Sequence, residues 1–214
     1  MENYKIVSLG YNCYVKKYVD DNFGKLETNF FDNTGISMWA INELFKNDFS
    51  DLFNIEDYEK MEIVPKYFVY TNKKYYLRFL HDLSDLSRFT TFKESYQRRI
   101  KRLDDLIKNQ NILFIRFEEH QNNRIMYDFY KEKFEKLELD YIKDFSNIIK
   151  NKYPNAKFKI IYISDIYEIE LVEDSNLLIL NKNAKYNWTW SNCSAVIKDM
   201  FEKNNEIIKQ FLNK

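Results

Sequence analysis

The alternation of hydrophobic and polar positions predicts strands and helices that follow one another along the chain. Short apolar runs over residues 4–9, 111–117, 157–164 and 176–181 are typical of buried strands. Helical spacing of apolar residues covers 13–22, 38–47 and 91–109, and further helices are expected within 123–152 and over 191–213. This order predicts an α/β fold, a layered α/β/α-type domain with a largely parallel sheet.

Two further extended runs, over residues 62–70 and 75–80, predict a β-hairpin around residues 62–80. Pro65 is expected to restrict the first run to a sheet edge, because proline cannot donate a hydrogen bond to a neighbouring strand. No internal repeat or low-complexity linker interrupts the chain. We therefore expect residues 1–214 to form a single α/β domain, with a helical insertion within 117–140.

Composition narrows the function classes. The chain has 33 basic and 33 acidic residues, and they alternate in segments such as 92–105, so nucleic acid is not an expected partner. No apolar stretch has the length of a membrane span and no signal-peptide pattern is present, which predicts a cytoplasmic protein. With two cysteines, two histidines and no metal-ligand motif, we expect reduced thiols, no metal and no cofactor. Glycine-rich nucleotide-binding motifs are also absent.

The strand–turn–helix at residues 5–17, KIVSLGYNCYVKK, carries the main chemical candidate. Gly10 ends the first strand and allows a tight turn, and Cys13 begins the helix, where parallel sheets bind ligands. A helix N-terminus favours a thiolate, so Cys13 is a candidate nucleophile with a lowered pKa. The backbone N–H groups of Asn12 and Cys13, or the Asn12 amide, are candidates for an oxyanion hole. The alternative is that Cys13 is a small buried core residue.

A cysteine nucleophile needs a base, and the chain offers His81 and His120. His81 ends an apolar strand and is the stronger candidate, since His120 lies in a charged segment typical of a surface. Asp82 would point to the opposite face of an extended chain. Asp32, in an aromatic-rich loop, is a better candidate to orient the imidazole, although an Asx turn is an equal alternative for it.

These segments together resemble the bacterial DUF1796 family, whose members are described as papain-like cysteine peptidases. The resemblance rests on VSLGYNC, NFFDNTGIS, LRFLHD, YQRRIKRL and NILFIRF, in this order, and covers roughly residues 5–165. Phe30 and Asn33 replace the family's proline and tryptophan around Asp32, which puts the local turn geometry in doubt. The resemblance implies a Cys13–His81 pair, assisted by Asp32 or Asp82.

The expected function is a cysteine-nucleophile hydrolase that acts on an acyl or amide bond of a peptide, acyl or glycan-linked small substrate. Arg98, Arg99 and Arg116 are candidates to bind an acidic substrate group, with a solvated helix face as the alternative for Arg98 and Arg99. The turn at Gly10 is a further substrate-binding candidate. In papain-like enzymes, however, the histidine comes from a later antiparallel sheet, whereas a nucleophile directly after the first parallel strand resembles SGNH/GDSL-type acyl hydrolases and acyltransferases. A third possibility is a non-catalytic α/β binding module linked to cell-surface polysaccharide enzymes.

Overall fold

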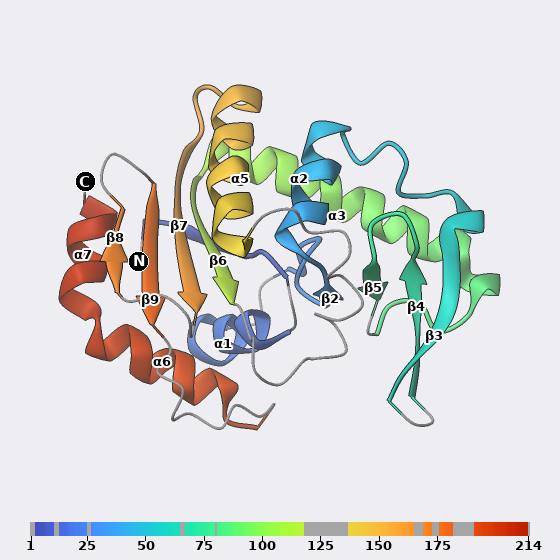
Figure 1. Cartoon of the computed structure of the whole chain (residues 1–214), viewed down its shortest axis with the longest axis horizontal. Helices are drawn as coiled ribbons and strands as arrows, with labels where there is room; N and C mark the ends of the chain where they lie inside the picture. Colours follow the sequence, from blue (N-terminus) through green and yellow to red (C-terminus); the bar gives the residue numbers. More distant parts are fainter. Residues whose placement is uncertain are drawn as a thin grey trace.

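A five-stranded sheet forms the centre of the larger half of the molecule (Figure 1). The structure, a computed structural model, describes residues 3–10, 13–24, 27–64, 67–79, 81–117, 137–164, 169–172, 176–181 and 191–213. Four strands are parallel, in the order β1 (Lys5–Ser8), β6 (Asn111–Phe117), β7 (Lys157–Ser164) and β9 (Leu177–Asn181). A short strand, β8 (Glu170–Leu171), runs antiparallel to β9 at the edge.

Helices cover both faces of this sheet, which confirms the predicted α/β/α layers. Alternate residues of β6 point to opposite faces: Ile112 and Phe114 join one core, and Leu113 and Ile115 join the other. The first core is covered by α2 (Met38–Lys46), α3 (Phe89–Asn109) and α5 (Glu138–Lys152). The second is covered by α1 (Tyr14–Phe23), α6 (Cys193–Lys203) and α7 (Asn205–Asn213).

A smaller antiparallel sheet lies beside the parallel one, in the order β2 (Thr34–Gly35), β5 (Leu77–Phe79), β4 (Tyr67–Asn72) and β3 (Tyr58–Val64). The predicted hairpin is confirmed as β4 and β5. The single strand expected over 62–70 is wrong: β3 and β4 form a hairpin of their own, with Val64 paired to Tyr67. Pro65 lies outside the described residues. Short 3₁₀ turns, η1 (Ile55–Asp57) and η2 (Leu86–Arg88), flank this sheet.

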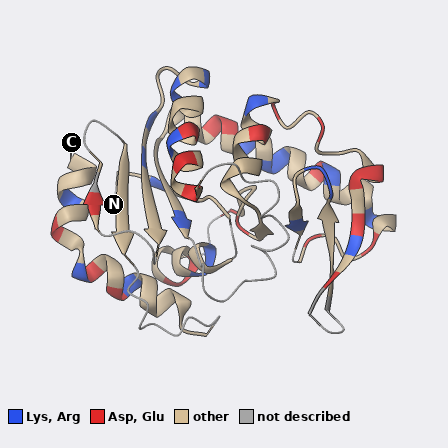
Figure 2. Cartoon of the chain, viewed as in Figure 1, with Lys and Arg blue, Asp and Glu red and all other residues tan. Residues whose placement is uncertain are grey.

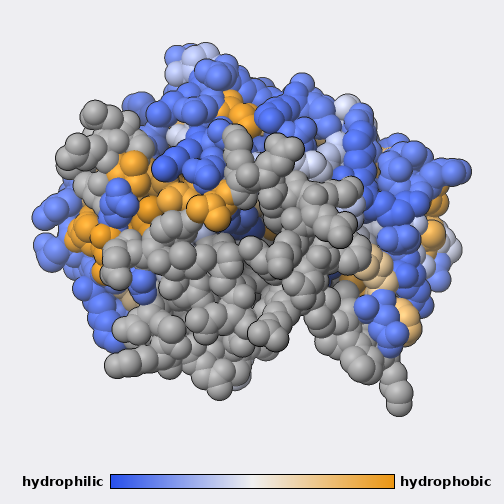
Figure 3. Space-filling view, in the orientation of Figure 1, coloured by the Kyte–Doolittle hydropathy of each residue, from blue (hydrophilic) through white to orange (hydrophobic). Residues whose placement is uncertain are grey.

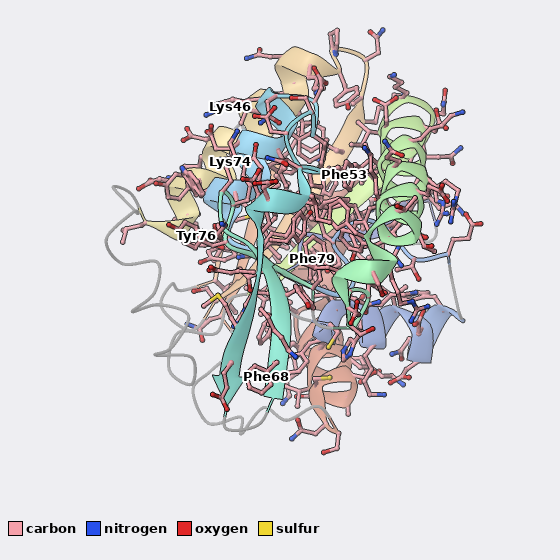
Figure 4. The ribbon with its side chains drawn as sticks, turned by 90° about the vertical axis from the view of Figure 1, so that its right-hand side faces the viewer. Lys46, Phe53, Phe68, Lys74, Tyr76 and Phe79 are labelled. Atoms are coloured by element: carbon pink, nitrogen blue, oxygen red, sulfur yellow. The ribbon has the colours of Figure 1, made fainter. Side chains whose placement is uncertain are left out.

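Helix α3 connects the small sheet to the parallel sheet (Figure 1). Its aromatic residues belong to a cluster of rings in the core. The ring of Phe79 on β5 lies 4.6 Å from that of Phe92 and 5.1 Å from that of Tyr96, both on α3. Phe30, in the loop before β2, lies 5.3 Å from Tyr96. Figure 4 shows Phe79 within this packed centre. These edge-to-face contacts hold the loop that contains Asp32 against α3.

Charged residues of both signs are interleaved along α3 and α5 (Figure 2). Hydrophobic surface gathers over β8, β9 and the beginning of α5 (Figure 3), where Leu137 and Ile169 are exposed. Among the described residues, no helix is both long enough and apolar enough to cross a membrane.

Candidate active site

Gly10 explains how the loop before β2 approaches the end of β1. Its φ of +70° belongs to the left-handed region, so the predicted tight turn is confirmed. A Cβ atom at this position would lie 2.5 Å from Ile36 Cγ2 and 3.4 Å from the Thr34 carbonyl oxygen. The Gly10 N–H also donates to Ser8 Oγ at 3.2 Å. Only a glycine allows this close contact between the end of β1 and the region of β2.

Cys13 occupies the N-cap position of α1, at the predicted place after β1. Its carbonyl oxygen accepts the Lys17 N–H at 2.9 Å, the first turn of the helix. The expected lowering of its pKa is wrong: burial raises the pKa of the thiol to about 11, and a hydrogen bond from its own backbone N–H offsets only part of this. At neutral pH the thiol is therefore protonated and becomes nucleophilic only when a base takes its proton.

The second cysteine of the chain lies near the first. Cys193 is the first residue of α6, which packs against α1, and its charge would further raise the pKa of Cys13. Burial also raises the pKa of Cys193, and neither cysteine forms a disulfide within the described part of the chain. Because these residues are 180 positions apart in the chain, sequence reasoning did not foresee their proximity.

Asp32 is buried in the loop before β2, with 2% of its surface exposed. Its carboxylate accepts the backbone N–H of Asn29 at 2.6 Å. Burial raises the pKa of Asp32 to about 6, against the lowering effects of the Asn29 N–H, Lys16 and Arg99. Lys16 belongs to α1 and Arg99 to α3. The Asp32 carboxyl group is therefore close to both helices.

Asn29 is a polar residue of this loop that the sequence analysis missed. It is 8% exposed, and its buried side-chain oxygen has no hydrogen-bond partner among the residues that the structure describes. A buried acceptor without a partner is costly, so such groups often serve a ligand or an unseen water. Its position three residues before Asp32 was the only sequence signal that could have singled it out.

His81 and Asp82 follow directly after β5, but they play different structural roles. His81 is exposed. The Asp82 carboxylate accepts the Tyr96 hydroxyl at 2.7 Å and Arg99 Nη1 at 2.7 Å. The Arg99 guanidinium in turn lies over the Tyr96 ring, 4.5 Å from its centre. Asp82 and Arg99 are therefore bound to each other, and this pair joins the end of β5 to α3.

Pairing between β2 and β5 brings the candidate residues toward one end of the small sheet. Thr34 pairs with Phe79, two residues before His81, and it approaches Gly10 so closely that a Cβ atom there would lie 3.4 Å from it. Cys13 follows Gly10 by three residues, and Asp32 precedes Thr34 by two. In the described part of the chain, however, no hydrogen bond joins Cys13, His81 and Asp32 to one another. The strand pairing thus brings the segments that carry these residues toward one another, and a catalytic arrangement of Cys13, His81 and Asp32 stays a prediction.

Arg116 is buried and hydrogen-bonded to three separate segments of the protein. It is 1% exposed, and its Nη1 donates to the carbonyl oxygens of Leu9, at 2.7 Å, and Ile36, at 2.9 Å. Its Nε donates to Glu138 Oε1 at 2.8 Å. These bonds join the end of β1, the loop after β2 and the start of α5. The guanidinium that we expected to bind substrate therefore stabilises the edge of the sheet where the candidate site lies.

Three further candidate residues, Arg98, Asn12 and His120, are either exposed or outside the described residues. Arg98 is exposed on α3 and donates to Ser95 Oγ at 3.0 Å. Asn12, the expected oxyanion donor, and His120 lie outside the described residues, as does most of the segment in which we expected an insertion. Within the described ranges, no three His, Cys, Asp or Glu residues are grouped so that they could hold a metal ion.

The family comparison agrees with the motifs in this region. A family model described as "Putative papain-like cysteine peptidase (DUF1796)" matches residues 4–168. The chain belongs to this family. The matched range includes β1, Cys13, Asp32, both small-sheet hairpins, His81 and the pair Asp82–Arg99. No curated protein and no solved structure matches the chain. At a coarse level, membership in this family supports a cysteine-dependent hydrolase.

Proposed function

We propose that this protein is a cysteine-nucleophile hydrolase that cleaves an amide or acyl bond. Cys13 Sγ attacks the substrate carbonyl while His81 accepts the thiol proton, and this proton then goes to the leaving amine or alcohol. Water hydrolyses the resulting thioester and regenerates the thiol. Asp32 assists the imidazole, and backbone N–H groups at the start of α1 stabilise the oxyanion. The substrate is a peptide, acyl or glycan-linked small molecule.

One observation carries this proposal: the contact between Gly10 and Thr34 and the pairing of Thr34 with Phe79 connect the two candidate segments. A cysteine after β1 and a histidine after β5 are 68 positions apart in the chain, yet their segments meet through β2. The raised pKa of Cys13 adds a requirement, since a protonated thiol needs general-base assistance. The parallel sheet also fits the SGNH/GDSL-like alternative, in which the same nucleophile would act on an ester or transfer an acyl group.

The test is acylation of the native protein by p-nitrophenyl acetate, with the modified residue identified by peptide mass. We expect a burst of p-nitrophenolate and an acetyl group on Cys13. His81→Ala should slow acylation roughly a hundredfold, the range of general-base catalysis. His120→Ala is the matched control, and Cys13→Ser identifies background modification.

Equal acylation rates in His81→Ala and His120→Ala would exclude His81 as the base. The partial burial of Cys13 favours a second candidate function, a non-catalytic binding module. If Cys13 is acylated only after unfolding, that second function is correct and the proposed hydrolase is not.

A further inference from the structure

A cavity of about 410 Å³ lies on a different side of α3 from the candidate active site. It opens to the surface and is lined by the end of α2 and the loop that follows it, by the middle of α3 and by the end of α5. In Figure 4 the labelled Phe53, one of its lining residues, lies between α2 and α3. Five residues of α3 line it, at positions 97, 100, 101, 103 and 104. Arg99 and Arg102, on another side of the helix, bind Asp82 and the Thr28 carbonyl oxygen. Its volume falls in the range of small-molecule sites.

The floor of this cavity is aromatic and apolar. Phe45, Phe49, Leu103 and Tyr153 line it and are each at most 8% exposed. The rings of Phe45 and Phe49 meet edge to face with centres 5.3 Å apart. Flat aromatic walls of this kind favour a ligand with an aromatic ring, because ring–ring contacts add to the burial of apolar surface.

The backbone of the loop is strained where it forms the floor. Asp48 and Phe49 both have φ of +58°, in the left-handed region. Asp48 has a structural explanation, since the Phe49 N–H donates to the Leu44 carbonyl oxygen at 2.9 Å and closes the end of α2. Phe49 adopts a conformation that is rare for a bulky residue, and the packing of its buried ring, 5.1 Å from Phe30 and 5.3 Å from Phe45, offsets the strain. This packing holds the ring at the cavity, and such backbone outliers concentrate at ligand sites.

Some polar side chains at the rim of the cavity bind other groups of the protein, and others remain available to a ligand. Lys152 binds the Phe45 carbonyl oxygen and the Asp48 carboxylate, and the Tyr153 hydroxyl donates to Asp104 at 2.9 Å. Lys101 and Gln97, one helical turn apart on α3, are exposed, and the described part of the chain offers neither of them a hydrogen bond or an ion pair. The rim therefore has one cation and one amide available beside an aromatic floor.

We propose that this cavity binds a small aromatic carboxylate. The ring packs on Phe45, Phe49 and Leu103, and the carboxylate accepts hydrogen bonds from Lys101 Nζ and the Gln97 amide. A charge-assisted hydrogen bond at the rim and ring contacts at the floor together select an acid over a neutral ring of the same size. This site is separate from the proposed hydrolase centre, and no step of that reaction depends on it.

The test is a titration with 2-naphthylacetate, followed by methyl NMR of Ile100 and Leu103, with 2-naphthaleneethanol as the neutral probe. We expect saturable binding and a preference of roughly tenfold for the acid, as a charged hydrogen bond gives. Lys101→Met should remove this preference and leave binding of the alcohol unchanged. Lys93→Met, on the same helix but outside the cavity, should bind like the unaltered protein.

Three outcomes would overturn the proposal: no shift of the Ile100 and Leu103 methyl signals up to the solubility limit, equal affinity for the acid and the alcohol, or an unchanged preference in Lys101→Met. Both lysine substitutions replace surface charges, and the methyl spectra themselves report whether each variant is folded. Because binding is measured directly, the result is independent of whether Cys13 is catalytic.

Discussion

Asp32→Asn should make the protein more stable at neutral and higher pH, because the native fold holds this carboxyl group in a site that disfavours its charge. Burial raises its pKa from 3.8 to about 6. A difference of one unit in pKa corresponds to about 1.4 kcal/mol, so the fold destabilises the ionised form of Asp32 by about 3 kcal/mol relative to the unfolded chain. The native state binds the proton more tightly than the unfolded chain, so stability falls as pH rises from about 4 to about 6.

An amide at this position is neutral at every pH, and its oxygen can still accept the Asn29 N–H. The variant should therefore exceed the unaltered protein by about 2 to 3 kcal/mol above pH 7, with the difference vanishing below pH 4. Urea unfolding at pH 4, 5, 6, 7 and 8 measures this directly. Asp105→Asn, an exposed position on α3, is the matched control. A difference that does not change with pH, or an Asn variant less stable at pH 8, would falsify the reasoning.

Two further substitutions test the structure around the site. Gly10→Ala combines a left-handed φ with a Cβ placed 2.5 Å from Ile36 Cγ2, and should cost about 2 kcal/mol or more. Gly24→Ala, with φ of +83° and no atom within 4 Å, adds backbone strain without a steric clash and should therefore cost less than Gly10→Ala in the same urea assay. Arg116→Met leaves Glu138 and two carbonyl oxygens without their donor and should cost about 3 to 5 kcal/mol. Arg98→Met, at an exposed position, should change the unfolding free energy by less than about 0.5 kcal/mol, and similar losses in both arginine variants would contradict the structural role of Arg116.

The parallel sheet could be predicted because its strands are short, continuous apolar runs, which only burial on both faces explains. The bounds of β6 and β7 agree with the sequence analysis residue for residue. The small sheet was harder to predict. β2 has only two residues and shows no periodicity of its own, and the run over 62–70 hides a turn between two strands. The C-terminal helix was expected to be continuous, but it is divided into α6 and α7 at Asn204.

The site was predictable only where a local constraint marks it. Gly10 has such a constraint, because the turn requires a positive φ. The partners of Arg116 come from three separate segments, so nothing near it in the sequence reveals them. The pKa of Cys13 was predicted in the wrong direction for a related reason. A helix N-terminus is visible in the sequence, but the burial that outweighs it depends on the whole fold.

The raised pKa of Cys13 distinguishes this mechanism from one in which the free enzyme already holds a thiolate–imidazolium ion pair. A cysteine that exists as a thiolate at neutral pH reacts without further help, whereas Cys13 must lose its proton during the attack. The rate of Cys13 acylation should therefore follow the titration of the assisting base. It should reach a plateau well below the pH at which the thiol itself ionises, because the base takes the proton during the attack. An unassisted thiol with a pKa of about 11 would instead accelerate roughly tenfold with each pH unit up to that value. A plateau that disappears in His81→Ala but persists in His120→Ala requires His81 as the base. A continuous rise to pH 10 in all three proteins would mean that the segments after β1 and β5 meet for structural reasons alone.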